Sequence, residues 1–156
     1  MPPDPTPPLP GSIRLLTWMS LFLILMILIL SLLDFGLLSC FINPIAAVLN
    51  MIYHLTVLLA THFRPAKAAA FTVTAISLGF LLSLTWLSAF LVMVFVALKG
   101  GAACDLFGLD IQFSNTVIST QRIQLLFTML EFAIMVDLSI RSTLKRRKRH
   151  ENTITY

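Results

Sequence analysis

The chain has 156 residues, of which 58% are apolar and only 12% are charged, and its formal net charge is +4. A soluble domain has roughly 45–50% apolar and about 25% charged residues. This composition therefore excludes an ordinary soluble domain as the main part of the chain and predicts an all-α, polytopic membrane protein with a single membrane domain.

The chain begins with a proline-rich segment, residues 1–12. Dense proline prevents regular helix and favours an extended polyproline conformation. The segment contains PxxP spacings, which some aromatic-lined grooves bind, but no basic residue flanks them. We expect a disordered tail without a partner.

Four apolar stretches follow, each long enough for a bilayer core that takes about 20 apolar residues per helix. The expected spans cover residues 13–37, 41–61, 69–98 and 117–140, within a transmembrane domain of residues 13–141. The first span exceeds the apolar region of about 7–15 residues in a secretory signal, so it is expected to remain as an uncleaved helix. Together the spans predict a left-handed, mostly antiparallel four-helix bundle.

The basic residues are concentrated on one side of this arrangement, and Lys and Arg near span ends set orientation in the membrane. They are Arg14, Arg64, Lys67, Arg141, Lys145, Arg146, Arg147, Lys148 and Arg149. The pattern predicts that both termini are cytoplasmic and that residues 142–156 form a polybasic cytoplasmic tail. Each basic residue near an anionic leaflet contributes about 1 kcal/mol of attraction, so Lys145, Arg146, Arg147, Lys148 and Arg149 are expected to anchor the topology and to contact anionic headgroups.

Two cysteines, Cys40 and Cys104, fall one in each predicted outer connection. An outer, oxidising compartment would allow a disulfide between them, but sequence does not give their separation. Unpaired thiols are the alternative. If the chain were inverted, both would be cytoplasmic thiols near the membrane and candidates for palmitoylation.

Two ionisable residues lie well inside predicted spans: His54 in the second and Glu131 in the fourth. At 1.5 Å of rise per residue, both lie roughly 20 Å below the outer boundary, so the sequence predicts a polar pair. The pair could be a proton relay or cation site, or a clasp that fixes how two helices dock. No internal repeat of the kind found in many transporters is visible, and we favour the clasp.

Other polar residues extend this pattern along both helices. The second span carries Asn43, Asn50, His54 and Thr61 on one stripe, and the fourth carries Gln121, Gln124, Thr128 and Glu131. Asp34 and Arg122 are expected at the same depth near the outer side, where they could form an ion pair. Asp137 and Arg141 are four residues apart on one helix and are expected to form a second ion pair.

The third span has small residues at four-residue spacing: Ala75, Gly79 and Ser83. Small residues at this spacing let helices approach closely, either within a bundle or in a homodimer. The sequence contains no recognisable catalytic or metal-binding motif. A lone His54 does not make a metal site, and no HExxH, GxSxG or phosphate-binding glycine loop occurs. We expect a non-enzymatic protein with no cofactor, no metal and no nucleic-acid partner.

The layout of four spans, a short first outer connection and a larger second one resembles the MARVEL-type membrane proteins, in particular small uncharacterised four-span proteins of fungi. The similarity covers residues 13–141 and rests on Arg14 before the first span, Asn43-Pro44 and Tyr53-His54 in the second, and Glu131 in the fourth. The resemblance implies membrane organisation or trafficking without enzymatic activity, and it carries over no catalytic residue.

The sequence thus predicts a multi-pass protein of the plasma membrane or endomembrane system that contacts membrane lipids and functions in membrane organisation or trafficking. One alternative is an accessory subunit of a larger membrane complex, with a membrane-protein partner or a second copy of itself. The other is a small proton-coupled transporter or channel that uses His54 and Glu131.

Overall fold

The computed structural model describes residues 11–33, 39, 41–63, 72–98 and 115–154, with the side chains of 115–118 and 149–154 left aside. It contains four helices, α1 (Gly11–Leu33), α2 (Ile42–Phe63), α3 (Val73–Leu98) and α4 (Asn115–Ile154). Each has a stretch long and apolar enough to cross a membrane. The prediction of an all-α chain with four such helices is confirmed.

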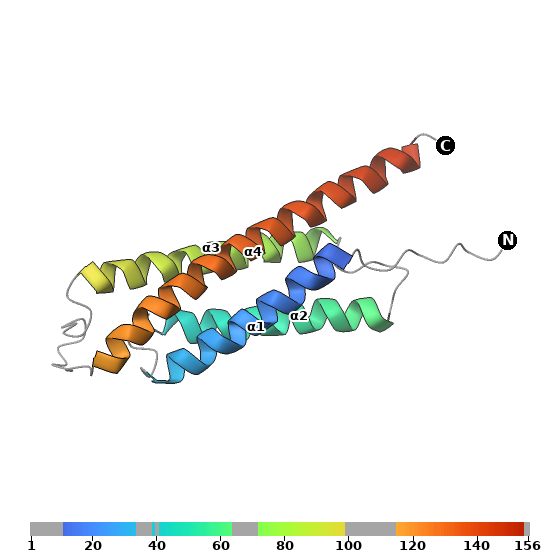
Figure 1. Ribbon diagram of the computed structural model, residues 1–156. Helices are drawn as coiled ribbons and strands as arrows, with labels where there is room; N and C mark the ends of the chain where they lie inside the picture. The colour runs from blue at the N-terminus through green and yellow to red at the C-terminus, as the bar shows by residue number, and fades with distance from the viewer. Residues whose placement is uncertain (1–10, 34–38, 40, 64–71, 99–114, 155–156) are drawn as a thin grey trace.

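The helices form an antiparallel bundle in which each one packs against two neighbours (Figure 1). The contact between α3 and α4 is the most extensive and that between α2 and α3 the least. The start of α1, the end of α2, the start of α3 and the end of α4 lie at one end of the bundle, which we call the terminal end. The opposite end is the far end.

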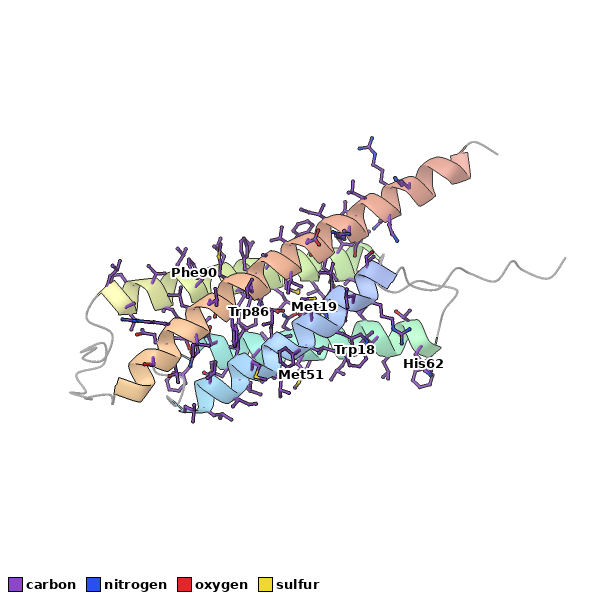
Figure 2. All side chains as sticks on the ribbon, viewed as in Figure 1. Trp18, Met19, Met51, His62, Trp86 and Phe90 are labelled. Atoms are coloured by element: carbon purple, nitrogen blue, oxygen red, sulfur yellow. The ribbon has the colours of Figure 1, made fainter. Side chains whose placement is uncertain are left out.

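The core follows a spacing of alternately three and four residues. On α1 the buried positions include Ile13, Thr17, Ser20, Ile24, Ile27 and Ser31, and on α3 they include Ala75, Gly79, Leu82, Trp86, Ala89, Met93 and Val96. This period of about 3.5 residues is that of helices packed as in a coiled coil, and it is typical of a left-handed supercoil. Figure 2 shows Trp86 near the middle of the bundle, where it is fully buried.

The outer surface is more apolar than parts of the core. Large exposed side chains such as Leu15, Phe22, Leu81 and Leu126 cover the outside, whereas Asn, Gln, His and Glu side chains are buried inside. A soluble protein rarely exposes so continuous an apolar surface. The arrangement suits a bundle whose outside meets hydrocarbon.

The helix boundaries differ from the expected spans mainly at the chain ends. Helix α1 begins at Gly11, slightly before the expected start, and α4 continues to Ile154. Residues 142–154, which we expected to be a tail, are therefore a helical continuation of the fourth span. The proline-rich residues 1–10 lie outside the described residues, as do Asp34, Cys40 and Cys104.

The start of α2 sets the position of its polar stripe. Phe41 has a φ of 63°, and its carbonyl accepts a hydrogen bond from the Ile45 amide at 3.4 Å. The buried Ser39 hydroxyl accepts one from the Asn43 amide at 3.3 Å. Pro44, in the first turn, lacks only an N–H that a helix start leaves unpaired. These contacts fix where α2 begins.

Candidate functional site: a buried polar cluster

Four polar side chains meet inside the bundle: Ser20 from α1, Asn50 and His54 from α2, and Glu131 from α4. Their exposed fractions are 0%, 0%, 1% and 0%. We call them the polar cluster. Ser20 and His54 each lie about 14 Å along their helices from the terminal end, at 1.5 Å per residue. Half the thickness of a bilayer core is about 15 Å, so the cluster lies near the expected midplane.

Ser20 is the centre of this cluster. Its hydroxyl donates to Glu131 Oε1, and the same carboxyl oxygen accepts from Asn50 Nδ2 at 2.8 Å. Ser20 Oγ also lies 2.7 Å from His54 Nε2. A hydroxyl has one proton to donate, so when Ser20 donates to Glu131, the His54 Nε2–H must be the donor to Ser20. The contacts thus join three helices through one hydroxyl.

His54 and Glu131, the predicted polar pair, lie in the same cluster but do not contact each other directly. Both side chains belong to the cluster, yet Ser20 links them where we expected a direct bond. Sequence reasoning missed Ser20 because serine is common on membrane helices. The available signal was its place in the series Ile13, Thr17, Ser20, Ile24, which has the spacing of a buried helix face.

The cluster has unused hydrogen-bonding capacity. Asn50 Oδ1, His54 Nδ1 and Glu131 Oε2 are buried and have no hydrogen-bond partner among the described residues. Most buried polar atoms in proteins have a partner, and unpartnered ones are costly away from water. The cluster can therefore accept further hydrogen bonds beyond its internal ones.

A second polar layer lies toward the far end. Asn43 Nδ2 donates to Met93 Sδ at 3.0 Å and to Gln124 Oε1 at 3.4 Å, and Thr128 Oγ1 donates to the Gln124 carbonyl at 2.7 Å. Asn43 precedes Asn50, and Gln124 precedes Glu131, by two helical turns, or about 10 Å. The predicted polar stripes of α2 and α4 thus lie in the core, where Asn43 meets Gln124 and Asn50 meets Glu131. Thr61 is only half-buried and bonds its own helix at Val57.

The small residues of α3 lie at a close approach to α4. A Cβ added at Gly79 would lie 2.6 Å from Ser139 Oγ and 3.3 Å from Tyr53 Oη. Ala75 and Ser83 are also buried, and the Ala75 carbonyl accepts from the Tyr53 hydroxyl at 3.0 Å. Of the two interpretations, packing within the bundle is the one that the structure uses.

Several charged residues lie on α4 outside the polar cluster. Arg141 Nε donates to both carboxyl oxygens of Asp137, at 2.9 and 2.8 Å, which confirms the predicted pair. Arg122 is exposed, but Asp34, its expected partner, lies outside the described residues. Arg146, Arg147 and Lys148 are exposed and Lys145 is half-buried, whereas the side chain of Arg149 lies outside the described part.

In the part of the chain that the structure describes, no three His, Cys, Asp or Glu residues lie close enough together to bind a metal ion. The cluster instead offers one carboxyl, one imidazole, one amide and one hydroxyl. These groups can dock helices, and they can hold or pass a proton along the series from His54 Nε2 through Ser20 Oγ to Glu131 Oε1.

No protein-family model matches this chain, and neither a curated protein nor a solved structure matches it. The class that the fold defines is an all-α protein with four candidate membrane-spanning helices, which indicates a multi-pass membrane protein.

Proposed function

We propose that this chain is a non-enzymatic membrane protein of membrane organisation or trafficking, with cytoplasmic termini, whose α4 extension binds anionic lipid headgroups. The observation that carries this proposal is that α4 continues without a break from its apolar span to Ile154. The basic residues from Lys145 to Lys148 are therefore held on a helix instead of a loose tail. Membrane organisation is also what the resemblance to MARVEL-type proteins implies.

The depth of these residues fits a headgroup contact. Ile13, near the start of α1, packs with Leu138 of α4, so the two residues mark one level in the bundle. At 1.5 Å per residue, Lys145 to Lys148 lie about 7–12 Å beyond the start of α1. The headgroup layer adds about 5–8 Å to each side of the hydrocarbon core. Long basic side chains at this height can reach lipid phosphates.

The basic side chains lie at the surface of the α4 extension. Asp137, one helical turn before Arg141, forms an ion pair with it. Arg146, Arg147 and Lys148 are exposed. With about 1 kcal/mol of attraction per charge near an anionic surface, four basic residues attract acidic lipids strongly at low salt and less at high salt.

The polar cluster supports the same proposal because it acts as a clasp between helices. It connects α1, α2 and α4 through Ser20 and fixes the bundle from which the basic extension projects. Interhelical hydrogen bonds of this kind help membrane helices associate, since lipid gives them no hydrophobic reason to do so.

Lipid enrichment around the reconstituted protein tests the proposal. The full chain, labelled at its C-terminus, is placed in vesicles of phosphatidylcholine with labelled phosphatidylserine, and energy transfer measures local enrichment. Replacing Lys145, Arg146, Arg147 and Lys148 with Gln should remove most of the enrichment, because each charge lost removes about 1 kcal/mol of attraction. Arg122→Gln, which removes an exposed charge near the other end of α4, should leave it unchanged. Equal enrichment in all three proteins would refute headgroup binding.

A proton-coupled transporter or channel is the second candidate, and one observation favours it. The series from His54 through Ser20 to Glu131 is a continuous hydrogen-bonded line between two ionisable groups. If this line carries protons, Glu131→Gln should abolish dissipation of a pH gradient in vesicles while the helical content and detergent stability stay unchanged. A wild-type protein that leaves the gradient intact would rule this candidate out.

A further inference from the structure

The contact between α2 and α3, the least extensive of the four between neighbouring helices, leaves an apolar groove of about 500 Å³. Leu49, Ile52 and Thr56 line it from α2, and Leu78 and Leu81 line it from α3, together with Thr72 just before α3. The groove lies in the half of the bundle toward the terminal end, because it follows the last turns of α2 and the first turns of α3.

The length of the groove matches one leaflet. From Leu49 to Ala60 on α2, and from Thr74 to Leu82 on α3, the lining residues extend about 12–16 Å at 1.5 Å per residue. The hydrocarbon core of a bilayer is about 30 Å thick. A groove of this length is about as long as one leaflet is thick. On α3 it ends near the midplane, and on α2 it continues to Leu49, about 7 Å past the level of His54.

The volume of the groove suits an alkyl chain. An α-helix with side chains is about 10 Å across, so the groove can receive only part of its width. A methylene group takes up about as much room as a water molecule in the liquid, about 30 Å³. The groove therefore holds about 16 methylene groups, the size of one acyl chain.

Three of the four hydroxyl groups that line the groove have hydrogen-bond partners. Thr56 Oγ1 donates to the Ile52 carbonyl at 2.7 Å, Tyr53 donates to the Ala75 carbonyl at 3.0 Å, and Thr72 Oγ1 accepts from the Ala75 amide at 3.2 Å. A polar ligand would find few unpaired groups in this wall. An apolar chain needs none.

We propose that this groove holds the acyl chain of one bound lipid from the leaflet at the terminal end. Lipid tails are as apolar as the helices, so the preference comes from contact and shape: a chain in the groove touches two helices, whereas a chain outside touches one. This site does not depend on headgroup charge, and it stands or falls separately from the basic extension.

Photocrosslinking in a purified system tests the site. The full chain is reconstituted with phosphatidylcholine that carries a diazirine on its acyl chain, and labelled residues are mapped by mass spectrometry. Ile52 lines the groove and Leu55 does not, yet their exposed fractions are 53% and 52%. A bound chain labels Ile52 about tenfold more than Leu55. Equal labelling of the two would show exchanging boundary lipid only and overturn the proposal.

A matched pair of variants gives the second readout. Thr56 and Thr85 both donate to a carbonyl one turn earlier in their own helices, but only Thr56 lines the groove. Thr56→Trp should fill the groove and reduce labelling of Ile52 about tenfold, while Thr85→Trp should leave it unchanged. If Thr56→Trp does not fold, the wild-type comparison of Ile52 with Leu55 still decides.

The same position separates a lipid from a protein partner. A photoreactive amino acid at Ile52, activated in the membranes of the expressing cell, should crosslink to lipid. A stoichiometric protein adduct at Ile52 would overturn the lipid site and favour the accessory-subunit interpretation.

Discussion

Replacing Ser20 with alanine removes the hydroxyl that joins α1 to α2 and α4. The change breaks the bond to Glu131 Oε1 and the 2.7 Å contact with His54 Nε2. Glu131 Oε1 keeps its bond from Asn50, whereas His54 Nε2 is left buried without a partner. Interhelical hydrogen bonds in membrane proteins contribute about 0.6 kcal/mol on average and about 1.7 at most. Two of them give an expected loss of about 1–3 kcal/mol in unfolding free energy.

Ser31→Ala is the matched control for this prediction. Ser31 lies on the same helix and is 2% exposed, against 0% for Ser20, but its hydroxyl has no partner among the described residues. Its removal should cost nothing or stabilise the fold slightly, because an unpartnered buried hydroxyl disappears. Any general effect of a serine-to-alanine change inside α1 appears in both variants.

Reversible unfolding by an anionic detergent in mixed micelles, followed by far-ultraviolet circular dichroism and by the fluorescence of the buried Trp86, measures both variants. The reasoning predicts that Ser20→Ala unfolds at a lower detergent fraction than the wild type and that Ser31→Ala does not. If the two variants differ by less than about 0.5 kcal/mol, the hydrogen bonds of Ser20 do not hold the bundle together.

Three further predictions use the same unfolding assay. Gly79→Ala should lose about 1–3 kcal/mol, because its Cβ would lie 2.6 Å from Ser139 Oγ. Adding Ser139→Ala should recover most of that loss, and no recovery would place the strain elsewhere. Glu131→Gln should cost at most about 1 kcal/mol, because Oε1 can still accept both bonds, whereas Glu131→Leu should cost about 2–3 kcal/mol by leaving two buried donors unpaired; similar losses would argue against the clasp. Asp137→Asn should change stability by less than about 1 kcal/mol, since its ion pair with Arg141 is 41% and 47% exposed, and a larger loss would mean that the pair is shielded from water.

Much of the fold could be predicted from the sequence because apolar length is a direct signal for membrane helices. The polar stripes of α2 and α4 could also be predicted from the sequence. Asn43, Asn50 and His54 recur with helical spacing, as do Gln121, Gln124, Thr128 and Glu131, and such residues avoid lipid. Their facing one another in the core follows from the cost of placing amides and a carboxyl in hydrocarbon.

The helical extension of α4 was not predicted, because hydropathy marks the apolar part of a helix and not its end. Lys and Arg have high helix propensity, and no Pro or Gly interrupts residues 142–154. The backbone therefore continues as helix where its side chains become polar. A propensity argument, applied after the span, would have indicated this extension.

Two other features depend on tertiary packing and gave no clear sequence signal. Ser20 is one of several hydroxyl residues on α1, and its role depends on meeting both His54 and Glu131. The groove between α2 and α3 depends on the less extensive contact of those two helices, which no local pattern encodes. The sequence showed which faces are buried, but not how closely each pair of faces approaches.

The most direct test of the proposed function is the enrichment of labelled phosphatidylserine around the reconstituted full chain, measured at low and at high salt. The account predicts enrichment at low salt, weaker enrichment at high salt, and loss of most of it when Lys145, Arg146, Arg147 and Lys148 are replaced with Gln. An enrichment that is absent, or that persists unchanged in the substituted protein, would contradict the proposal that the α4 extension binds anionic headgroups.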